Sequence, residues 1–136
     1  MNDKVFHDTN ILVYLYSVDD DEKRRVALSI LDKHICFTSI QVLNEASNVW
    51  FKRLGWTGEQ IYPYLDNIEH VCDAIVNVNR DTINLALILK DRYRYSYFDC
   101  LVLASALESE CSIIYTEDLS NGQVINDRLV IVNPFS

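Results

Sequence analysis

The sequence predicts an α/β fold in which helices cover both faces of a parallel sheet. Five short, strand-like apolar segments alternate with longer segments in which apolar residues recur every three or four positions. Glycine and proline are scarce, with three and two of 136 residues, while 49% of the residues are hydrophobic, which is typical of a packed domain. Strands that alternate with helices in this way usually form a parallel sheet.

The expected strands are runs of apolar and often β-branched residues. They cover residues 4–7, 35–38, 74–78, 112–115 and 129–132. The expected helices show the 3.6-residue period and cover residues 10–16, 22–33, 39–54, 57–71, 80–93 and 97–110. The last of these helices is apolar almost all round, so we expect it to be buried.

Three of these helices start with a capping signal. Thr38 and Gln41 fit a capping box ahead of the third helix, and Thr57 can cap the fourth. Ser96 and Asp99 have the spacing of a capping box at the start of the last helix.

One domain over residues 1–136 is expected, because this length supplies a sufficient core. Asp3 and Lys4 interrupt any cleavable signal, and no apolar run is long enough to cross a bilayer. The cysteines are scattered in apolar surroundings without a C-x-x-C pair, which predicts reduced core residues of a cytoplasmic protein. They are Cys36, Cys72, Cys100 and Cys111.

The formal net charge of −8 argues against broad electrostatic binding of nucleic acid. It is compatible with a local basic rim, with an acidic cluster neutralised by metal, or with a basic protein partner.

Asp8 interrupts an apolar run, VFHDTNILVY, at the end of the first expected strand. An ionised carboxylate is costly to bury without partners. Taken alone, Asp8 is equally well explained as the N-cap of the following helix or as part of a site at the carboxyl edge of the sheet.

Two further carboxylates lie in apolar helices. Asp99 shares a helical face with Val102 and Ala106, and we favour a functional role although a capping box also explains it. Glu45 lies on the apolar stripe of its helix, and alone it is better explained as a boundary residue whose head reaches water.

Asp118 follows the strand at 112–115, again at the carboxyl end of a strand. A turn at Asn121 and Gly122 also explains it, and Glu117 is the neighbouring candidate.

Three of these four carboxylates fall at strand ends or at a helix start on what should be one edge of the sheet. Carboxylates this close repel one another and raise each other's pKa unless a cation lies between them. Oxygen ligands select Mg²⁺ or Mn²⁺, and no cluster of histidines or cysteines competes, since both residue types are dispersed. The sequence therefore predicts a divalent metal site.

The segments that carry these residues resemble PIN-domain ribonucleases, most of all the VapC-type toxins of bacterial toxin–antitoxin pairs. The matching blocks are FHDTNILVYLYS, SIQVLNEASNV, YSYFDCLVLASALE, IIYTEDLSNGQVI and LVIVNPF. They follow the family order over essentially the whole chain. The resemblance implies a three-layer α/β sandwich with a central parallel five-stranded sheet, in agreement with the strands expected above.

The resemblance also implies roles for the acidic residues in a Mg²⁺ or Mn²⁺ site. Asp8 and Asp99 match the family's most direct metal ligands. Asp118 would bind a second metal or a ligating water, and Glu45 would hold a metal-bound water directly or through other groups. All four acids are present, as in an active enzyme.

Supporting roles follow for neighbours of these acids. Thr9 and Thr116 occupy motif positions where the family often has a polar side chain near the metal. Asn10 is better explained as fixing the turn.

The segment before Asp99 alternates arginine and tyrosine, which suits phosphate pairing and base stacking. Arg92, Arg94 and Tyr95 are therefore candidate RNA-binding residues. A helix end with extended arginines and core tyrosines explains most of these residues slightly better. Lys52 and Arg53 form another basic spot that we interpret as a solvated face.

The implied activity is metal-dependent hydrolysis of RNA phosphodiester bonds by the toxin of a type II toxin–antitoxin pair. RNA, a cognate antitoxin and a second copy of the chain are the implied partners. The antitoxin is expected near the helices that follow Ser17 and Ser39, with a basic side chain among the carboxylates.

A PIN-domain RNA-processing nuclease and a binding-only PIN module remain alternatives. An aspartyl phosphatase is disfavoured because Asn10 stands where that class needs a second aspartate, and a receiver domain because it needs paired acids after the first strand.

Overall fold

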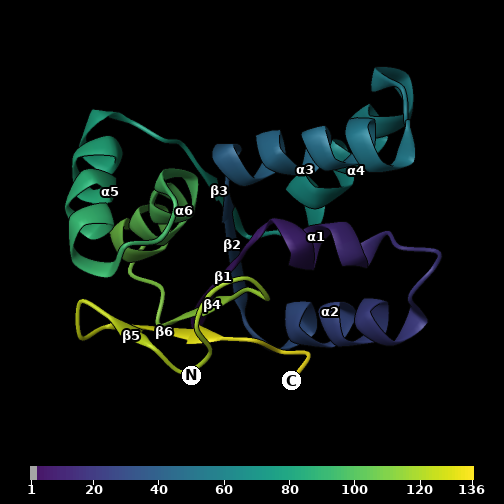
Figure 1. Ribbon diagram of the computed structural model, residues 1–136. Coiled ribbons are helices and arrows are strands. Elements are labelled where there is room, and N and C mark those ends of the chain that lie inside the picture. Colours follow the sequence, from purple (N-terminus) through teal and green to yellow (C-terminus); the bar gives the residue numbers. More distant parts are fainter. Residues whose placement is uncertain (1–2) are drawn as a thin grey trace.

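A mostly parallel sheet runs through the computed structural model, which describes residues 3–136 (Figure 1). Within these residues the sheet has six strands in the order β3-β2-β1-β4-β6-β5. The strands are β1 (Lys4–His7), β2 (Ile35–Ser39), β3 (Ala74–Val76), β4 (Ile113–Tyr115), β5 (Val124–Ile125) and β6 (Leu129–Val132). Neighbouring strands pair in parallel, except that β5 runs antiparallel to β6.

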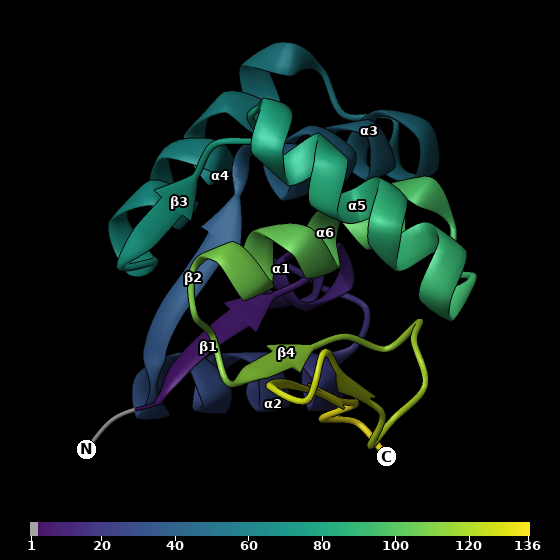
Figure 2. The ribbon, with the colours of Figure 1, turned by 90° about the vertical axis from the view of Figure 1, so that its left-hand side faces the viewer.

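Helices cover both faces of this sheet, as the alternating pattern predicts. They are α1 (Thr9–Leu15), α2 (Asp21–Lys33), α3 (Ile40–Leu54), α4 (Gly58–Val71), α5 (Arg80–Tyr93) and α6 (Tyr97–Glu108). Figure 1 shows α5 and α6 on one side of the sheet and α1 and α2 on the other, and Figure 2 shows α5 and α6 in front of the strands. The prediction of an α/β sandwich with a central parallel sheet is confirmed.

The strand count is the one correction to the predicted architecture. The short β5 adds a sixth strand to the expected five, because the chain turns back through Asn126 and Asp127 and pairs Ile125 with Leu129. Two residues are too few to show strand periodicity. The predicted domain 1–136 includes residues 1 and 2, which lie outside the described residues.

The helix starts follow the capping signals with one exception. Thr57 and Gln60 form a complete capping box at α4, and the Ser96 hydroxyl accepts a hydrogen bond from the Asp99 amide at α6. The predicted box at Thr38 is wrong. Ser39 caps α3 instead, and the Thr38 hydroxyl donates to the His7 carbonyl oxygen on β1. Thr38 lies in a buried strand, so its hydroxyl is used between strands rather than along the helix.

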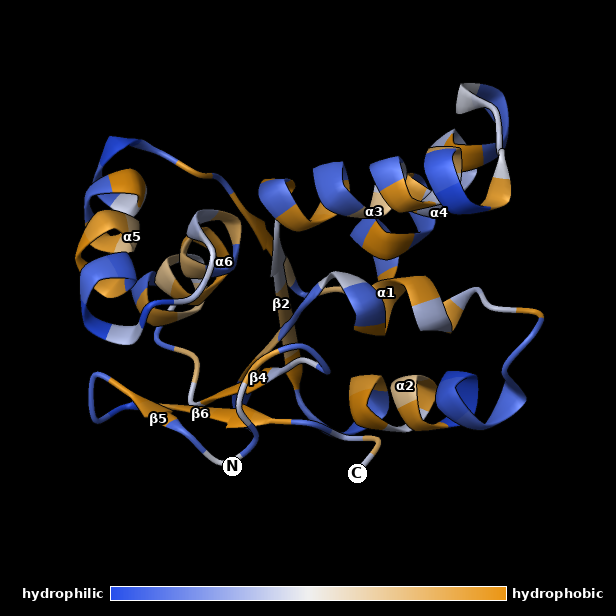
Figure 3. Cartoon of the chain, viewed as in Figure 1, coloured by the Kyte–Doolittle hydropathy of each residue, from blue (hydrophilic) through white to orange (hydrophobic). Residues whose placement is uncertain are grey.

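The core combines side chains of the sheet with side chains of all six helices, and α6 is the helix buried most fully in it. Eight of the twelve residues of α6 are buried, which confirms the expected buried helix. Fully buried side chains of central strands, such as Phe6, Ile114 and Ile131, pack in the same cluster. Burying a side chain of this kind contributes roughly 1.5–3 kcal/mol. Figure 3 shows the strands β4 and β6 as largely hydrophobic and the helices as a mixture of hydrophilic and hydrophobic residues.

The cysteines are part of this core. All four are buried and free of disulfides, as predicted, and the Cys36 thiol donates a hydrogen bond to the Cys72 sulfur at 2.9 Å. No helix in residues 3–136 combines the length and the apolar character needed to cross a membrane.

The topology places the carboxyl ends of the parallel strands at one edge of the sheet. The chain leaves β1 for β2 on one side and later returns to β4 on the other side, so the strand order reverses between β1 and β4. Open α/β sheets bind ligands in the crevice at such a reversal. Asp8 directly follows β1, and Asp118 comes three residues after the end of β4.

Candidate active site

All four carboxylates that the sequence singled out line one cavity. The cavity has a volume of about 260 Å³ and is lined by Asp8, Thr9, Asn10, Glu45, Asn48, Val49, Asp99 and Asp118. The lining residues come from the start of α1, the middle of α3, the start of α6 and the loop after β4. Segments far apart in the sequence therefore converge at the carboxyl edge of the sheet.

Asp8 is the most deeply buried of the four acids, with 5% of its surface exposed. Its Oδ1 accepts a hydrogen bond from the Thr9 amide at 2.7 Å, so Asp8 is the N-cap of α1. Its Oδ2 accepts a hydrogen bond from the Thr116 hydroxyl at 2.8 Å. Asp8 thus caps the helix and faces the cavity, and the two interpretations of this residue hold together.

Burial raises the pKa of Asp8, the hydrogen bonds from Thr9 and Thr116 oppose this shift, and the nearby Glu45 and Asp99 add to it, so that the pKa is about 6. Keeping this carboxylate ionised is therefore costly without a positive partner.

Glu45 and Asp118 are each held by a residue of the motif that follows Asp8. The Thr9 hydroxyl donates to Oε2 of Glu45 at 2.9 Å, and the Asn10 amide donates to Oδ2 of Asp118 at 2.8 Å. Asn10, in the first turn of α1, therefore orients an acidic side chain.

The acids also act on one another electrostatically. Burial raises the pKa of Glu45, with further contributions from Asp99 and Asp118. Burial likewise raises the pKa of Asp118, with Asp99 and Glu117 adding to the shift and Arg53 opposing it. The four carboxylates thus form one electrostatically coupled group.

The donor set fits a hard divalent cation, because carboxylates from four elements face one polar cavity. In residues 3–136, however, no three acidic, histidine or cysteine side chains are already close enough to hold a metal ion. Glu45 and Asp118 instead accept the hydrogen bonds from Thr9 and Asn10.

Glu117 does not join this group. Its carboxylate accepts hydrogen bonds from the Tyr14 hydroxyl at 2.5 Å and from the Lys23 ammonium at 2.6 Å. Partial burial raises the pKa of Glu117, but these two bonds outweigh it, so the pKa falls below its ordinary value. Glu117 ties the loop after β4 to α1 and α2, on the side away from the cavity lining.

The candidate RNA-binding residues are largely occupied within the protein. Arg92 donates to the Asn126 side chain at 2.6 Å, and the Tyr95 hydroxyl accepts from the Ser120 amide and donates to Gln123. Arg94 ends α5 in a left-handed conformation and is exposed. Their contact with RNA stays a prediction.

Asn48 and Val49 also line the cavity, and sequence reasoning missed them. They lie three and four positions after Glu45 on α3, so helical spacing from Glu45 was the signal that could have found them. Arg53, one further turn along, is close enough to Asp118 to lower its pKa.

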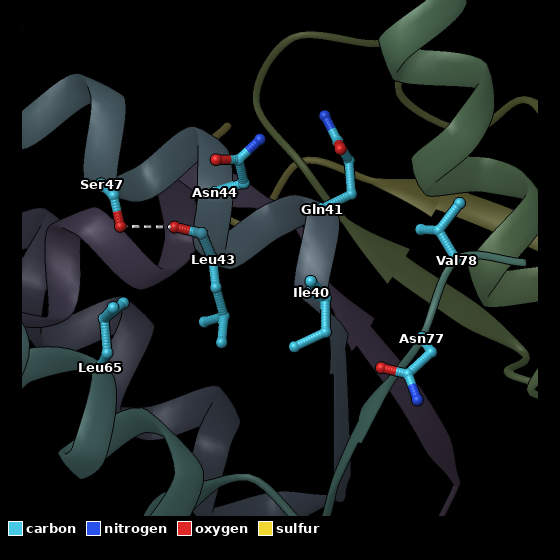
Figure 4. A pocket seen from close by; sticks show the side chains of 8 residues that line it. All are labelled: Ile40, Gln41, Leu43, Asn44, Ser47, Leu65, Asn77 and Val78. Atoms are coloured by element: carbon cyan, nitrogen blue, oxygen red, sulfur yellow. Dashed lines mark hydrogen bonds between the residues drawn. The ribbon is translucent and has the colours of Figure 1, made fainter.

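A larger cavity of about 570 Å³ lies between α3, α4 and the segment after β3 (Figure 4). Figure 4 shows its lining, which combines aliphatic side chains with amides and a serine: Ile40, Gln41, Leu43, Asn44, Ser47, Leu65, Asn77 and Val78. The lining contains no titratable group. The smaller acidic cavity is therefore the one equipped for chemistry.

The chain belongs to the PIN-domain family, because the family model matches residues 5–120. Among solved structures, VapC-type toxins and toxin–antitoxin complexes share its fold, which confirms the resemblance drawn from the sequence blocks.

One similar structure is the Mycobacterium tuberculosis VapC20 toxin, described as cleaving the sarcin–ricin loop, with 21% identity and a TM-score of 0.64 over 84% of this chain and 89% of that chain. A toxin–antitoxin complex from Klebsiella pneumoniae has 22% identity and a TM-score of 0.72 over 96% and 97%. VapBC2 from Rickettsia felis, bound to a promoter DNA fragment, has 16% identity and a TM-score of 0.67 over 96% and 99%. The comparison with curated proteins gave no match.

Proposed function

We propose that this PIN-domain protein is an endoribonuclease that depends on Mg²⁺ or Mn²⁺ and is the toxin of a type II toxin–antitoxin pair. The observation that carries the proposal is the convergence of Asp8, Glu45, Asp99 and Asp118 on one cavity at the strand-order reversal. Membership of the PIN-domain family and the fold shared with VapC-type toxins support it.

In this proposal Asp8 and Asp99 hold the cation directly, and Asp118 and Glu45 hold it directly or through water. When bound, a divalent cation offsets the charge that develops on the phosphate and makes water more acidic. The buried position of Asp8 and its two hydrogen bonds fix its carboxylate before substrate arrives.

The protein groups then orient the hydrolysis. Glu45 is held by the Thr9 hydroxyl, and in this proposal it would accept a hydrogen bond from the attacking water. Water attacks phosphorus in line with the leaving 3′ oxygen, so the products carry 5′-phosphate and 3′-hydroxyl ends. This chemistry does not use the 2′-hydroxyl, so preference for RNA depends on contacts in the groove.

The proposed partners follow from the same assignment. An antitoxin would dock near α2 and α3, where large apolar side chains of α3 are about half exposed: Ile40, Phe51 and Leu54. A basic antitoxin side chain among the carboxylates would offset their repulsion. We also propose a homodimer and action in the cytoplasm, where buried cysteines stay reduced.

Mapping of RNA ends after brief expression in cells tests the function and separates a toxin from a processing nuclease. We expect cleavage at one or a few discrete sites in tRNA or rRNA, absent from cells that express Asp99→Asn. Maturation ends of precursor RNA would favour the processing nuclease instead. An identical RNA pattern with the wild-type chain and with Asp99→Asn would overturn the nuclease assignment.

A further inference from the structure

Tyr95 links the two elements that carry Asp99 and Asp118. It directly precedes Ser96, the N-cap of α6, and Asp99 lies in the first turn of that helix. Its side chain reaches across to the loop after β4, in which Asp118 lies between Thr116 and Ser120.

The Tyr95 hydroxyl makes two hydrogen bonds to this loop. It accepts one from the Ser120 amide at 3.1 Å and donates another to Oε1 of Gln123. Ser120 and Gln123 are themselves joined, because the backbone N–H of Gln123 donates to the backbone carbonyl oxygen of Ser120 at 3.1 Å. One hydroxyl therefore holds a closed turn that begins two residues after Asp118.

We propose that Tyr95 is a positioning residue that sets the separation of Asp99 and Asp118 and thereby the affinity of the site for a divalent cation. The inference rests on the proposed function, because it assumes that these two carboxylates share a cation. It differs from the stacking role that the sequence indicated for Tyr95, since that role needs the ring and not the hydroxyl.

The physical reason is the exposure of the loop. Asp118 and Ser120 are exposed, and Asp118 faces other carboxylates that repel it. Asn10 and the Thr116 hydroxyl hold Asp118 itself. Loss of the Tyr95 hydroxyl would release the following turn of the loop and let Asp118 shift away from Asp99 within those bonds, which lowers the repulsion. A cation would then have to pull the loop back, and its apparent affinity would fall by the cost of that reordering.

Tyr93 provides a matched control on the same segment. Its hydroxyl also anchors a turn, accepting from the Asn126 amide at 2.8 Å and donating to the Asn126 side chain at 3.3 Å. That turn joins β5 to β6 and carries none of the four acids.

Mn²⁺ titration of the purified chain without RNA, followed by the EPR signal of unbound Mn²⁺, tests the proposal. We expect Tyr95→Phe, which removes both hydrogen bonds, to raise the Mn²⁺ dissociation constant about threefold to tenfold, and Tyr93→Phe to leave it unchanged. Cleavage of RNA by Tyr95→Phe should recover at saturating Mn²⁺. Gln123→Ala removes one of the two bonds from the loop side and should give a smaller loss.

An unchanged dissociation constant in both Tyr95→Phe and Gln123→Ala would overturn the positioning role while leaving an active nuclease intact. Equal weakening by Tyr93→Phe would show a general structural effect and overturn it too. A raised RNA KM in Tyr95→Leu, with normal Mn²⁺ binding in Tyr95→Phe, would assign the ring to RNA instead. If Tyr95→Phe weakens Mn²⁺ binding but the wild-type chain cleaves no RNA, only the proposed function would be overturned.

Discussion

The Thr116 hydroxyl donates to the Asp8 carboxylate at 2.8 Å and joins residues that are 108 positions apart in the sequence. The same hydroxyl accepts a hydrogen bond from the Asp118 amide at 3.3 Å. Asp8 follows β1 and Thr116 follows β4, so one side chain couples the ends of two neighbouring strands with two of the four acids. Thr116 itself is fully buried.

Thr116→Val keeps the shape of this side chain and removes its polar atom. We expect the metal-dependent cleavage rate to fall about tenfold, the equivalent of roughly 1.4 kcal/mol, because Asp8 and the Asp118 backbone lose a shared partner. Thr38→Val is the matched control, since Thr38 is equally buried and donates to a backbone carbonyl oxygen. Equal loss of cleavage in the two variants would contradict the role of Thr116.

Asp8→Asn should stabilise the metal-free protein at pH 7.5. The raised pKa of Asp8, about 6 against an ordinary 3.8, means that the folded state holds its proton more tightly than the unfolded state. The contribution of Asp8 to the unfolding free energy is therefore fully present below pH 4 and is lost as the pH rises through 6. For a shift of about two pKa units this loss is up to about 3 kcal/mol. Asparagine removes this decline because it has no charge to bury.

Urea unfolding in EDTA at pH 4 and pH 7.5 measures this effect. The variant should gain about 1–3 kcal/mol in unfolding free energy over the wild type at pH 7.5 and almost nothing at pH 4. A variant that is less stable than the wild type by the same amount at both pH values would refute the buried-charge explanation.

Glu117→Gln should weaken the fold slightly and leave RNA cleavage close to normal, because Glu117 bonds to Lys23 and Tyr14 outside the cavity lining. The lowered pKa of Glu117 means that its contribution is present above the ordinary value of 4.5 and is lost as the pH falls below it. A double-mutant cycle with Lys23→Met should give a coupling of about 0.5–1 kcal/mol at pH 7 that disappears near pH 3. Loss of cleavage as severe as in Asp99→Asn would place Glu117 in the site after all.

Arg53→Gln should raise the KM for RNA severalfold with little change in kcat, because Arg53 is the basic group that acts on Asp118. We predict that Arg53 pairs with one RNA phosphate, so its loss should also reduce the salt dependence of log KM by about 0.7. Arg92→Gln is the control, since Arg92 already bonds to Asn126. A larger KM effect in Arg92→Gln would move the RNA path to α5.

Much of this fold could be predicted from periodicity and capping residues. The buried helix α6 and the cap at Thr57 follow from local sequence. The missed β5 and the misplaced cap at Thr38 have different causes. β5 pairs with the neighbouring β6 and, with only two residues, is too short to show periodicity. The Thr38 hydroxyl instead donates to a partner 31 positions away, the His7 carbonyl oxygen. Local patterns carry no information about such partners.

The candidate site could likewise be predicted only in part from the sequence. The topology of parallel strands predicted that Asp8 and Asp118 would share an edge, and the structure places both at one cavity. The sequence could not predict the direction in which each side chain points. Glu117 and Asp118 are adjacent, yet they accept hydrogen bonds from Lys23 and Asn10 respectively, on different sides of the loop.

The most direct test of the central claim is RNA cleavage by the purified wild-type chain and by Asp99→Asn, each assayed with Mn²⁺ and with excess EDTA. We predict cleavage only for the wild type with Mn²⁺, with 5′-phosphate ends, while circular dichroism shows the same fold in both proteins. Equal cleavage by Asp99→Asn, or undiminished cleavage in EDTA, would contradict a metal-dependent nuclease built on these carboxylates.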